Sequence, residues 1–297
     1  MPGMCISGDR QRRVCEIASI DVGEGVISGV SRLRNRIYVV SLVCDESNVI
    51  AVFTSEPPFT HLQDIVVDDL QSRWDIAASV DIGCLYVPDP CSRSVWRISV
   101  DYGAVVEWLT GLVAWNVTVT YDDRVVVLVC TDTQETEHDF VWHGEVRVYR
   151  TDAMVESVVK LSPDITNPWS VVMTSKETFI VSHHGWWLDK MHRVCEVDKT
   201  GRVLKAFGSF RGNSVDQLDW PVSVSLDDEE RVIVADSDNS RVLMLSRELT
   251  SPRVIASWQP QSQEDDPDCP CYLHYDSLTG NLLVGLDDGR VDVFNLK

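Results

Sequence analysis

Residues 220–246 read WPVSVSLDDEERVIVADSDNSRVLMLS, and the pattern of this stretch decides the fold class. Three short apolar runs, PVSVSL, RVIVAD and SRVLMLS, are separated by acidic or polar turns. Short β-branched runs bounded by Gly, Asp, Asn or Pro are typical of β-strands. The stretch is therefore either a single hairpin arrangement or one unit of a repeat, and the rest of the chain distinguishes the two.

The third run of this stretch has relatives along the whole chain. They are SNVIAVF (47–53), RSVWRIS (93–99), GEVRVYR (144–150), HRVCEVD (192–198) and GRVDVFN (289–295). Each copy has a valine in its third position, and successive valines lie 46 to 51 residues apart. Two further series of short apolar runs precede each copy, as in VISGVS (26–31) and RIYVVS (36–41). A period of this length indicates a repeat architecture.

A fourth apolar run follows most units, for example VVEWL (105–109) and VIASW (254–258), but the sixth unit has none before Lys297. The run RVCEIASI (13–20) is left over near the N-terminus and can supply the missing strand. A ring of sheets in which the first and last segments share one blade leaves only short edges. We therefore predict an all-β fold, a six-bladed β-propeller of four-stranded antiparallel blades closed by the N-terminal strand.

The whole chain is expected to form one domain. The expected blades span residues 26–67, 74–109, 115–161, 168–208, 220–258 and 271–296, with the closing strand at 13–20. A solenoid of the same period is the alternative fold. It would need terminal repeats with polar outer faces, and no such repeat is visible in the sequence.

Composition narrows the class of protein. The chain has 297 residues, 44% of them hydrophobic, and a net charge of −20, which favours basic partners or cations and opposes a polyanion such as RNA. No window is apolar enough for a membrane helix, and the N-terminal stretch lacks the apolar core of a secretory signal. The nine cysteines are scattered, which favours reduced thiols. We expect a cytoplasmic monomer without a membrane contact.

Residues 220–246 resemble the NHL repeat, whose pattern runs from a proline through alternating apolar residues to Ala-Asp, Asn, Arg and valine. The matching positions are Pro221, Val222, Val224, Asp227, Val232, Val234, Asp236, Asn239, Arg241 and Val242. The resemblance is good over this blade, partial at 167–184 and at GRVDVF, and poor in the first three blades. It implies a propeller like the C-terminal domains of TRIM-NHL proteins. NHL propellers as a class serve as interaction domains in ubiquitin-ligase-type proteins, as RNA binders and as lyases.

Two residues of that pattern have a structural interpretation. Asp236 and Arg241 flank the turn between the second and third strands of their blade. A charge-assisted hydrogen bond between them would hold the turn together.

The longest internal loops are candidates for binding. In a propeller the loops between strands two and three share a face with the linkers between blades, and residues 130–145 and 182–192 are the two longest of these loops. The candidate partner-binding residues are His138, Phe140, Trp142, His143, His183, His184, Trp186 and Trp187. Aromatic side chains with polar neighbours suit a protein interface. The histidines could instead bind zinc beside Glu137, Asp139 or Asp189, but their spacing matches no metal motif.

Two more groups of residues are candidates for binding sites. The tryptophans that recur where inner strands begin are Trp74, Trp115, Trp169 and Trp220. We expect them around the channel mouth of the same face, either packed between blades or forming an aromatic ring for a ligand. On the opposite face we expect one basic patch of six arginines, namely Arg10, Arg12, Arg13, Arg32, Arg34 and Arg36. It suggests an acidic partner or nucleic acid.

The sequence has no nucleophile elbow, phosphate-binding glycine loop or HExxH motif, so no catalytic residue is assigned. Our first hypothesis is a non-enzymatic scaffold without a cofactor that binds a protein partner through its loop-rich face. A metal-dependent hydrolase or lyase with Ca²⁺ or Zn²⁺ in the central channel is the alternative. RNA binding through the arginine patch is a second alternative.

Overall fold

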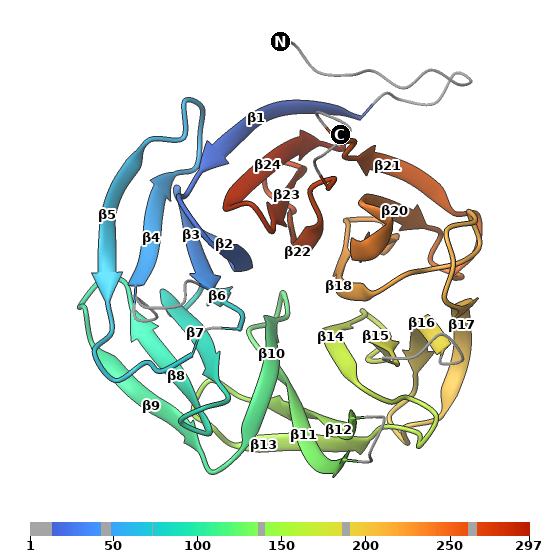
Figure 1. The fold of residues 1–297 in the computed structure, drawn as a ribbon. Coiled ribbons are helices and arrows are strands. Elements are labelled where there is room, and N and C mark those ends of the chain that lie inside the picture. Colours follow the sequence, from blue (N-terminus) through green and yellow to red (C-terminus); the bar gives the residue numbers. More distant parts are fainter. Residues whose placement is uncertain (1–13, 43–48, 73, 136–139, 186–190, 261–265) are drawn as a thin grey trace.

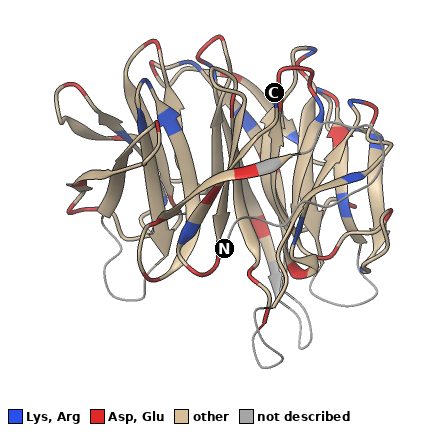
Figure 2. Cartoon of the chain, turned by 90° about the horizontal axis from the view of Figure 1, so that it is seen from above, with Lys and Arg blue, Asp and Glu red and all other residues tan. Residues whose placement is uncertain are grey.

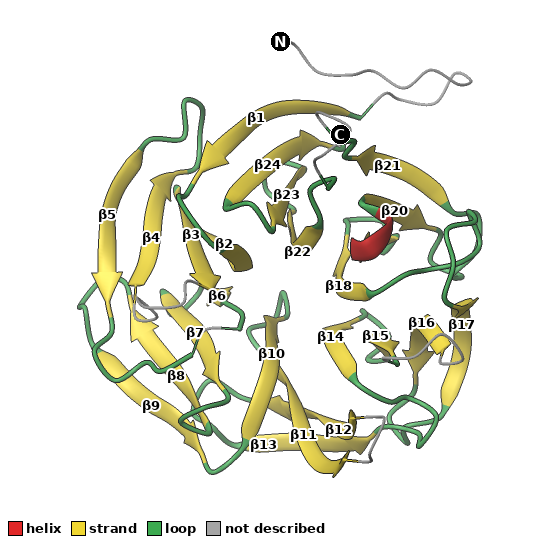
Figure 3. Ribbon diagram, in the orientation of Figure 1, coloured by secondary structure: helices red, strands yellow, loops and turns green. Residues whose placement is uncertain are grey.

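The computed structural model of the chain describes residues 14–42, 49–72, 74–135, 140–185, 191–260 and 266–297. Within these ranges the strands form six sheets, each of four antiparallel strands, arranged radially around a central channel (Figure 1). The predicted six-bladed β-propeller is confirmed. The helical element of the described ranges is the short 3-10 turn η1 (Ser237–Asn239) in the fifth blade (Figure 3).

The first three blades follow one another along the chain, each beginning at the channel and ending at the outer rim. Blade 1 holds β2 (Val26–Leu33), β3 (Arg36–Leu42), β4 (Val49–Thr54) and β5 (His61–Val66). Blade 2 holds β6 (Ala77–Ser79), β7 (Cys84–Asp89), β8 (Ser94–Ser99) and β9 (Val105–Thr110). Blade 3 holds β10 (Val113–Val119), β11 (Val125–Glu135), β12 (Phe140–Tyr149) and β13 (Val155–Lys160).

The other three blades complete the circle. Blade 4 holds β14 (Pro168–Met173), β15 (Phe179–His184), β16 (Met191–Val197) and β17 (Val203–Phe210). Blade 5 holds β18 (Pro221–Leu226), β19 (Val232–Asp236), β20 (Arg241–Leu245) and β21 (Arg253–Ser257). Blade 6 holds β22 (Pro270–Asp276), β23 (Asn281–Leu286), β24 (Arg290–Asn295) and, as its outer strand, β1 (Cys15–Asp21).

The ring is closed as the sequence predicts. Strand β1 pairs antiparallel with β24 over its length, from Cys15 opposite Asn295 to Asp21 opposite Arg290. Ile20, which lies opposite Val291, is buried in the apolar layer between blades 6 and 1. The closing strand therefore adds both backbone hydrogen bonds and apolar contact to the last blade.

The core is a set of apolar layers between neighbouring blades. Each sheet carries apolar side chains on both faces, so it must be covered on both sides by its neighbours. Between blades 1 and 2, for example, Val40 and Ile50 pack with Leu85 and Ile98, and all four are fully buried. Similar layers join each remaining pair of neighbours around the circle.

Seen edge-on, the disc has its turns and loops on its two flat faces (Figure 2). We name the side with the linkers between blades and the loops between second and third strands the linker face. The side with the turns between first and second strands is the turn face. None of the described residues forms a helix long and apolar enough to cross a membrane.

Candidate functional site

The inner strands share a local irregularity that shapes the channel. Five of the six contain a one-residue shift in register with the second strand, and the extra residues are Ser28, Trp115, Trp169, Val222 and Cys271. A bulge of this kind re-aims side chains. All five extra residues, together with Trp74 just before β6, line a cavity of about 340 Å³ at the linker-face end of the channel. The bulges therefore aim one residue from each of five blades into the same space, and blade 2 contributes Trp74.

The residues that follow the extra residues tie the blades together. Asn116 Nδ2 and Val117 N donate to Asp75 Oδ2 at 2.6 and 2.8 Å, and Val171 N donates to Asn116 Oδ1 at 2.8 Å. We call this set of inter-blade bonds the channel belt. In the next blades Val224 N donates to Ser170 Oγ at 3.2 Å, and Leu273 N donates to Ser223 Oγ at 3.1 Å. Each polar side chain thus satisfies a backbone N–H of the following blade, which would otherwise be buried without a partner.

Blade 1 interrupts the belt because Gly29 stands at the equivalent position. A Cβ atom there would come within 2.7 Å of the backbone nitrogen of Ile76. Tyr272 of blade 6 reaches past this gap, and its hydroxyl donates to Ile76 O of blade 2 at 3.4 Å. The phenol therefore bridges two blades that are not neighbours.

Asp75 is buried at the centre of this belt. Burial raises the pKa of its carboxyl to about 7, and the nearby Tyr272 hydroxyl, the N–H groups of Val117 and Ile76 and the amide of Asn116 oppose the rise. Asn116 and Val117 of the next blade are among its partners, so in this structure the carboxyl links two blades.

The four predicted mouth tryptophans meet in the cavity, which we name the tryptophan mouth. Trp74, Trp115, Trp169 and Trp220 are each half-buried and line it. The ring centroids of Trp74 and Trp115 lie 4.7 Å apart at 76°, an edge-to-face contact, and Trp115 and Trp169 lie 5.9 Å apart. Trp220 differs from the other three because it precedes the bulge of its strand by two residues and has a positive φ of 60°.

A second layer of rings supports these tryptophans. Trp142 stacks on Trp115 with centroids 5.8 Å apart at 29°, and His184 stacks on Trp169 at 5.4 Å and 10°. The His184 ring also lies 3.8 Å from that of Trp220. Trp142 and His184 are buried and do not line the cavity. They therefore hold the mouth rings from behind.

The two buried histidines beside the mouth, His184 and His192, are neutral. Burial lowers the pKa of His184 well below its ordinary value, and it also lowers the pKa of His192. His192 Nδ1 accepts a hydrogen bond from Trp220 N at 2.9 Å, so Nε2 carries the proton and donates to Gly185 O at 3.0 Å. His192 thereby fixes the backbone of Trp220.

The predicted loop residues separate into groups. His138, Trp186 and Trp187 lie outside the described residues, as does the side chain of Phe140. Trp142, His183 and His184 are buried, because β11 and β12 and also β15 and β16 continue further than the sequence runs indicated. In this structure these three side chains shape the base of the loops. His143 is half-buried and lines a separate groove of about 640 Å³ between blades 2 and 3.

His183 and His184 point to opposite faces of their strand. His183 Nε2 lies 3.6 Å from Cys195 Sγ and accepts from Arg193 Nε at 3.2 Å. Burial, followed by the positive charge of Arg193, lowers the pKa of His183 to about 3, and burial raises the pKa of Cys195 to about 12. A catalytic cysteine needs the thiolate and a basic imidazole, so this pair is unsuited to nucleophilic chemistry.

The arginines of the predicted basic patch are largely neutralised where they are described. Arg32 pairs with Asp276, and Arg34 makes a two-point contact with Asp101 at 2.6 and 2.9 Å. Arg36 is exposed, and Arg10, Arg12 and Arg13 fall outside the described residues. Two of the three described arginines of the patch therefore already have a carboxylate partner.

Asp236 and Arg241 lie opposite each other in the β19–β20 pair, and Arg241 Nε donates to Asp236 Oδ2 at 2.6 Å. The same guanidinium donates to the backbone oxygens of Asn213, Ser214 and Gln217 at 2.9 to 3.1 Å. Asp236 is fully buried, and burial raises its pKa to about 6. The pair thus holds both its own turn and the linker that leads into blade 5.

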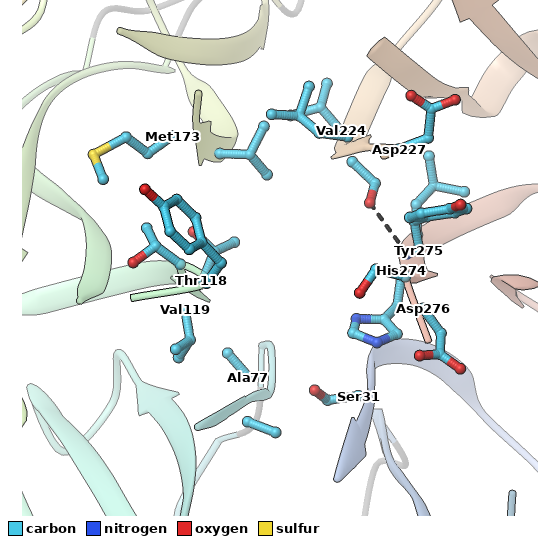
Figure 4. Close-up of a pocket in the computed structure, with 18 of the residues that line it drawn as sticks. Ser31, Ala77, Thr118, Val119, Met173, Val224, Asp227, His274, Tyr275 and Asp276 are labelled. Atoms are coloured by element: carbon cyan, nitrogen blue, oxygen red, sulfur yellow. Dashed lines mark hydrogen bonds between the residues drawn. The ribbon is translucent and has the colours of Figure 1, made fainter. Parts of the chain in front are cut away.

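The turn-face end of the channel is wider, with a cavity of about 890 Å³. His274 points into it from β22, near Ser31 and Asp276 (Figure 4). Its many carboxylates are mostly paired, as with Glu230 and Arg247 at 2.7 Å and Asp228 and Lys297 at 3.3 Å. Across the described ranges, no three His, Cys, Asp or Glu side chains gather as metal ligands would.

Sequence reasoning missed the channel belt, the bulges and the supporting layer. The signal for the belt was the recurrence of a small polar residue after a tryptophan, in Trp74-Asp75, Trp115-Asn116 and Trp169-Ser170. Tyr272 and His192 carried no such signal, because neither follows a tryptophan in the sequence.

No protein-family description and no curated protein sequence matches this chain. A solved structure of a protein of unknown function from Bacteroides caccae is similar in fold. It has a TM-score of 0.55 and 15% sequence identity, covering 80% of this chain and 78% of that chain. Identity this low shows the fold alone, so the class of protein is a six-bladed β-propeller and its function has to be argued from the site.

Proposed function

We propose that this protein is a non-catalytic scaffold that binds a protein partner over its linker face, with the tryptophan mouth at the centre of the contact. The observation that carries the proposal is the mouth itself, a cavity of about 340 Å³ lined by four half-buried tryptophans. Tryptophans that served only the core would be covered by the blades. Tryptophan is enriched among the residues that dominate protein interfaces, especially when a rigid scaffold presents it.

We also propose that the chain is an NHL-like propeller of the interaction type. Three residues of the NHL pattern, Asp236, Asn239 and Arg241, are joined in one bonded turn, with Asn239 Nδ2 donating to Asp236 Oδ2 at 2.9 Å. These hydrogen bonds explain why the repeat pattern has Asp, Asn and Arg at these three positions. They support the fold relationship, and the choice of the interaction role comes from the mouth.

The test compares partner capture by two matched variants. Val222→Arg places a long side chain in the tryptophan mouth, whereas Tyr121→Arg places the same side chain on the turn face, where Tyr121 is 88% exposed. Circular dichroism and melting temperature establish that both variants fold. Quantitative mass spectrometry should find a protein retained by wild type and Tyr121→Arg but lost by Val222→Arg. Identical capture by all three proteins contradicts the proposal.

The other two hypotheses stay predictions. Elemental analysis after loading with Ca²⁺ or Zn²⁺ tests the metal-dependent enzyme, and stoichiometric metal in the channel would favour it. Titration with single-stranded RNA at low salt tests the arginine patch, because electrostatic binding weakens steeply as salt rises.

A further inference from the structure

We infer that the tryptophan mouth takes the side chain of a lysine or arginine from a basic segment of the protein partner. This inference rests on the proposed function, because it names the chemistry of the partner at the same site. The observations behind it are the aromatic lining, the charge of the rim and the size of the cavity.

Four indole rings line the cavity. One face of Trp115 is covered by Trp142, and one face of Trp169 is covered by His184, and neither covering ring lines the cavity. Trp74 lies within 6.3 Å of both tryptophans, measured between ring centroids. Trp74, Trp115 and Trp169 therefore form a continuous aromatic wall of the cavity, with Trp142 and His184 packed against two of its rings. The face of an indole is the best side-chain surface for a cation.

The rim of the mouth is acidic. The described lining contains the carboxylates of Asp238 and Asp287, which are both exposed, and no Lys or Arg. Asp238 and Asp219 share Arg211, whose guanidinium donates to Asp238 at 3.1 Å and to Asp219 at 2.9 Å. Two carboxylates on one guanidinium leave that group of three with a net negative charge. A cation in the cavity therefore has indole rings around it and carboxylates at the rim.

The supporting histidines do not oppose a cation. His184 lies against both Trp169 and Trp220, and burial keeps its pKa well below the ordinary value. The ring is consequently neutral at physiological pH, and the wall of the mouth carries no positive charge from it.

The size of the cavity favours one side chain over a larger element. A volume of about 340 Å³ lies at the lower end of the range for ligand sites, and it is too small for a helix. The apolar stem of lysine or arginine can lie along the wall of the cavity while the charged head lies among the tryptophan rings, near the negative charge of the rim. A nucleic-acid base could stack on the same rings, but its phosphates would meet Asp238 and Asp287.

The test uses a family of peptides with a single variable residue. A capped 11-residue peptide of glycine and serine carries lysine, arginine, norleucine or glutamine at its centre, and binding is measured by calorimetry and by tryptophan fluorescence. Lysine and arginine peptides should bind more tightly than the norleucine peptide, by about fivefold or more, and the difference should shrink as salt rises. Equal binding of the lysine and norleucine peptides would overturn the inference.

Charge variants test the rim without changing the rings. The double variant Asp238→Asn/Asp287→Asn should weaken binding of the lysine peptide and leave binding of the norleucine peptide unchanged. The matched control Asp69→Asn/Glu156→Gln removes the same charge from exposed sites in the linker after blade 1 and on the outer strand β13, and it should behave as wild type. Equal weakening of lysine-peptide binding by both double variants would show a general charge effect and contradict the inference.

The outcomes separate this inference from the proposed function. If Val222→Arg abolishes capture of a partner while Asp238→Asn/Asp287→Asn retains it, the scaffold function is supported. The inference that the mouth takes a basic side chain is then contradicted. If Val222→Arg also retains the partner and no peptide binds, both proposals fail.

Discussion

The side-chain amide of Asn116 donates to the carboxylate of Asp75 at 2.6 Å, across the boundary between the second and third blades. The same carboxylate oxygen accepts the backbone N–H of Val117 at 2.8 Å. One acidic residue therefore holds the inner strand of the next blade by both its backbone and a side chain. Because the mouth tryptophans immediately precede these two residues, the belt also fixes the position of the binding surface.

Asp75 should make stability depend on pH. The folded protein keeps the proton up to about pH 7, because burial raises the pKa of this carboxyl to about 7, whereas the unfolded chain releases it near pH 4. The free energy of unfolding should therefore fall as pH rises from about 4 to about 7 and then level off. Urea unfolding at pH 5 and pH 8 measures the fall.

The variant Asp75→Asn has no proton to lose and should show a smaller fall over the same interval, although its overall stability is lower because the amide cannot accept every bond. Asp69→Asn, at an exposed site, should keep the wild-type fall. An unchanged fall in Asp75→Asn would show that other groups cause the pH dependence.

Gly29 should tolerate no side chain. A Cβ atom there would lie 2.7 Å from Ile76 N and 2.9 Å from Asp75 C, and these backbone atoms cannot move without disturbing the belt. We expect Gly29→Ala to lower the free energy of unfolding by about 1–3 kcal/mol, the usual range for overpacking. At Gly212 the nearest atoms belong to the end of the Gln217 side chain, which can rotate away. Gly212→Ala is therefore the control, and an equal loss in both variants would argue against a steric cause.

Arg241 should be essential to the turn of blade 5. The variant Arg241→Ala leaves the fully buried Asp236 without its ion pair and removes three bonds to the preceding linker. Loss of one partner of a buried pair costs about 3–5 kcal/mol, and a loss of this order should appear in chemical unfolding. Arg202 is 76% exposed and lies 3.8 Å from Asp198. Arg202→Ala should therefore change stability by less than about 0.5 kcal/mol.

Closure of the ring can be tested on two isoleucines of the same strand. Ile20 is 2% exposed and Ile17 is 47% exposed. Ile20→Ala should lower the free energy of unfolding by about 2–4 kcal/mol, whereas Ile17→Ala should have little effect. Similar small losses from both substitutions would mean that β1 contributes little to the stability of blade 6.

The sequence was informative where periodicity reports local structure. Alternating apolar runs at a constant interval predict strands and their number, and the leftover run at 13–20 predicts closure. Burial was harder to predict for Trp142 and His184. Their strands continue into what the sequence shows as polar loops, so both residues lie on strands and turn inward.

The detailed geometry of the mouth was not predictable for a physical reason. A bulge adds one residue to one strand, and this reverses the face of every residue beyond it. Because both faces of a blade are apolar, the sequence of apolar residues does not show where the bulge lies. Trp115 and Asn116 therefore both reach the channel, although strict alternation would place them on opposite sides. The contact of Tyr272 with blade 2 also depends on the absence of a side chain at Gly29, which only the assembled ring reveals.

The pairing of Cys15 with Asn295 has a consequence for biosynthesis. A ribosome adds about 5–20 residues per second, so the earlier strand waits roughly a quarter of a minute to a minute before its neighbour is made. During this delay five blades can assemble while β1 has no strand to pair with. Nascent copies on adjacent ribosomes can exchange this segment during the delay, because an unpaired strand edge is open to pairing with another copy.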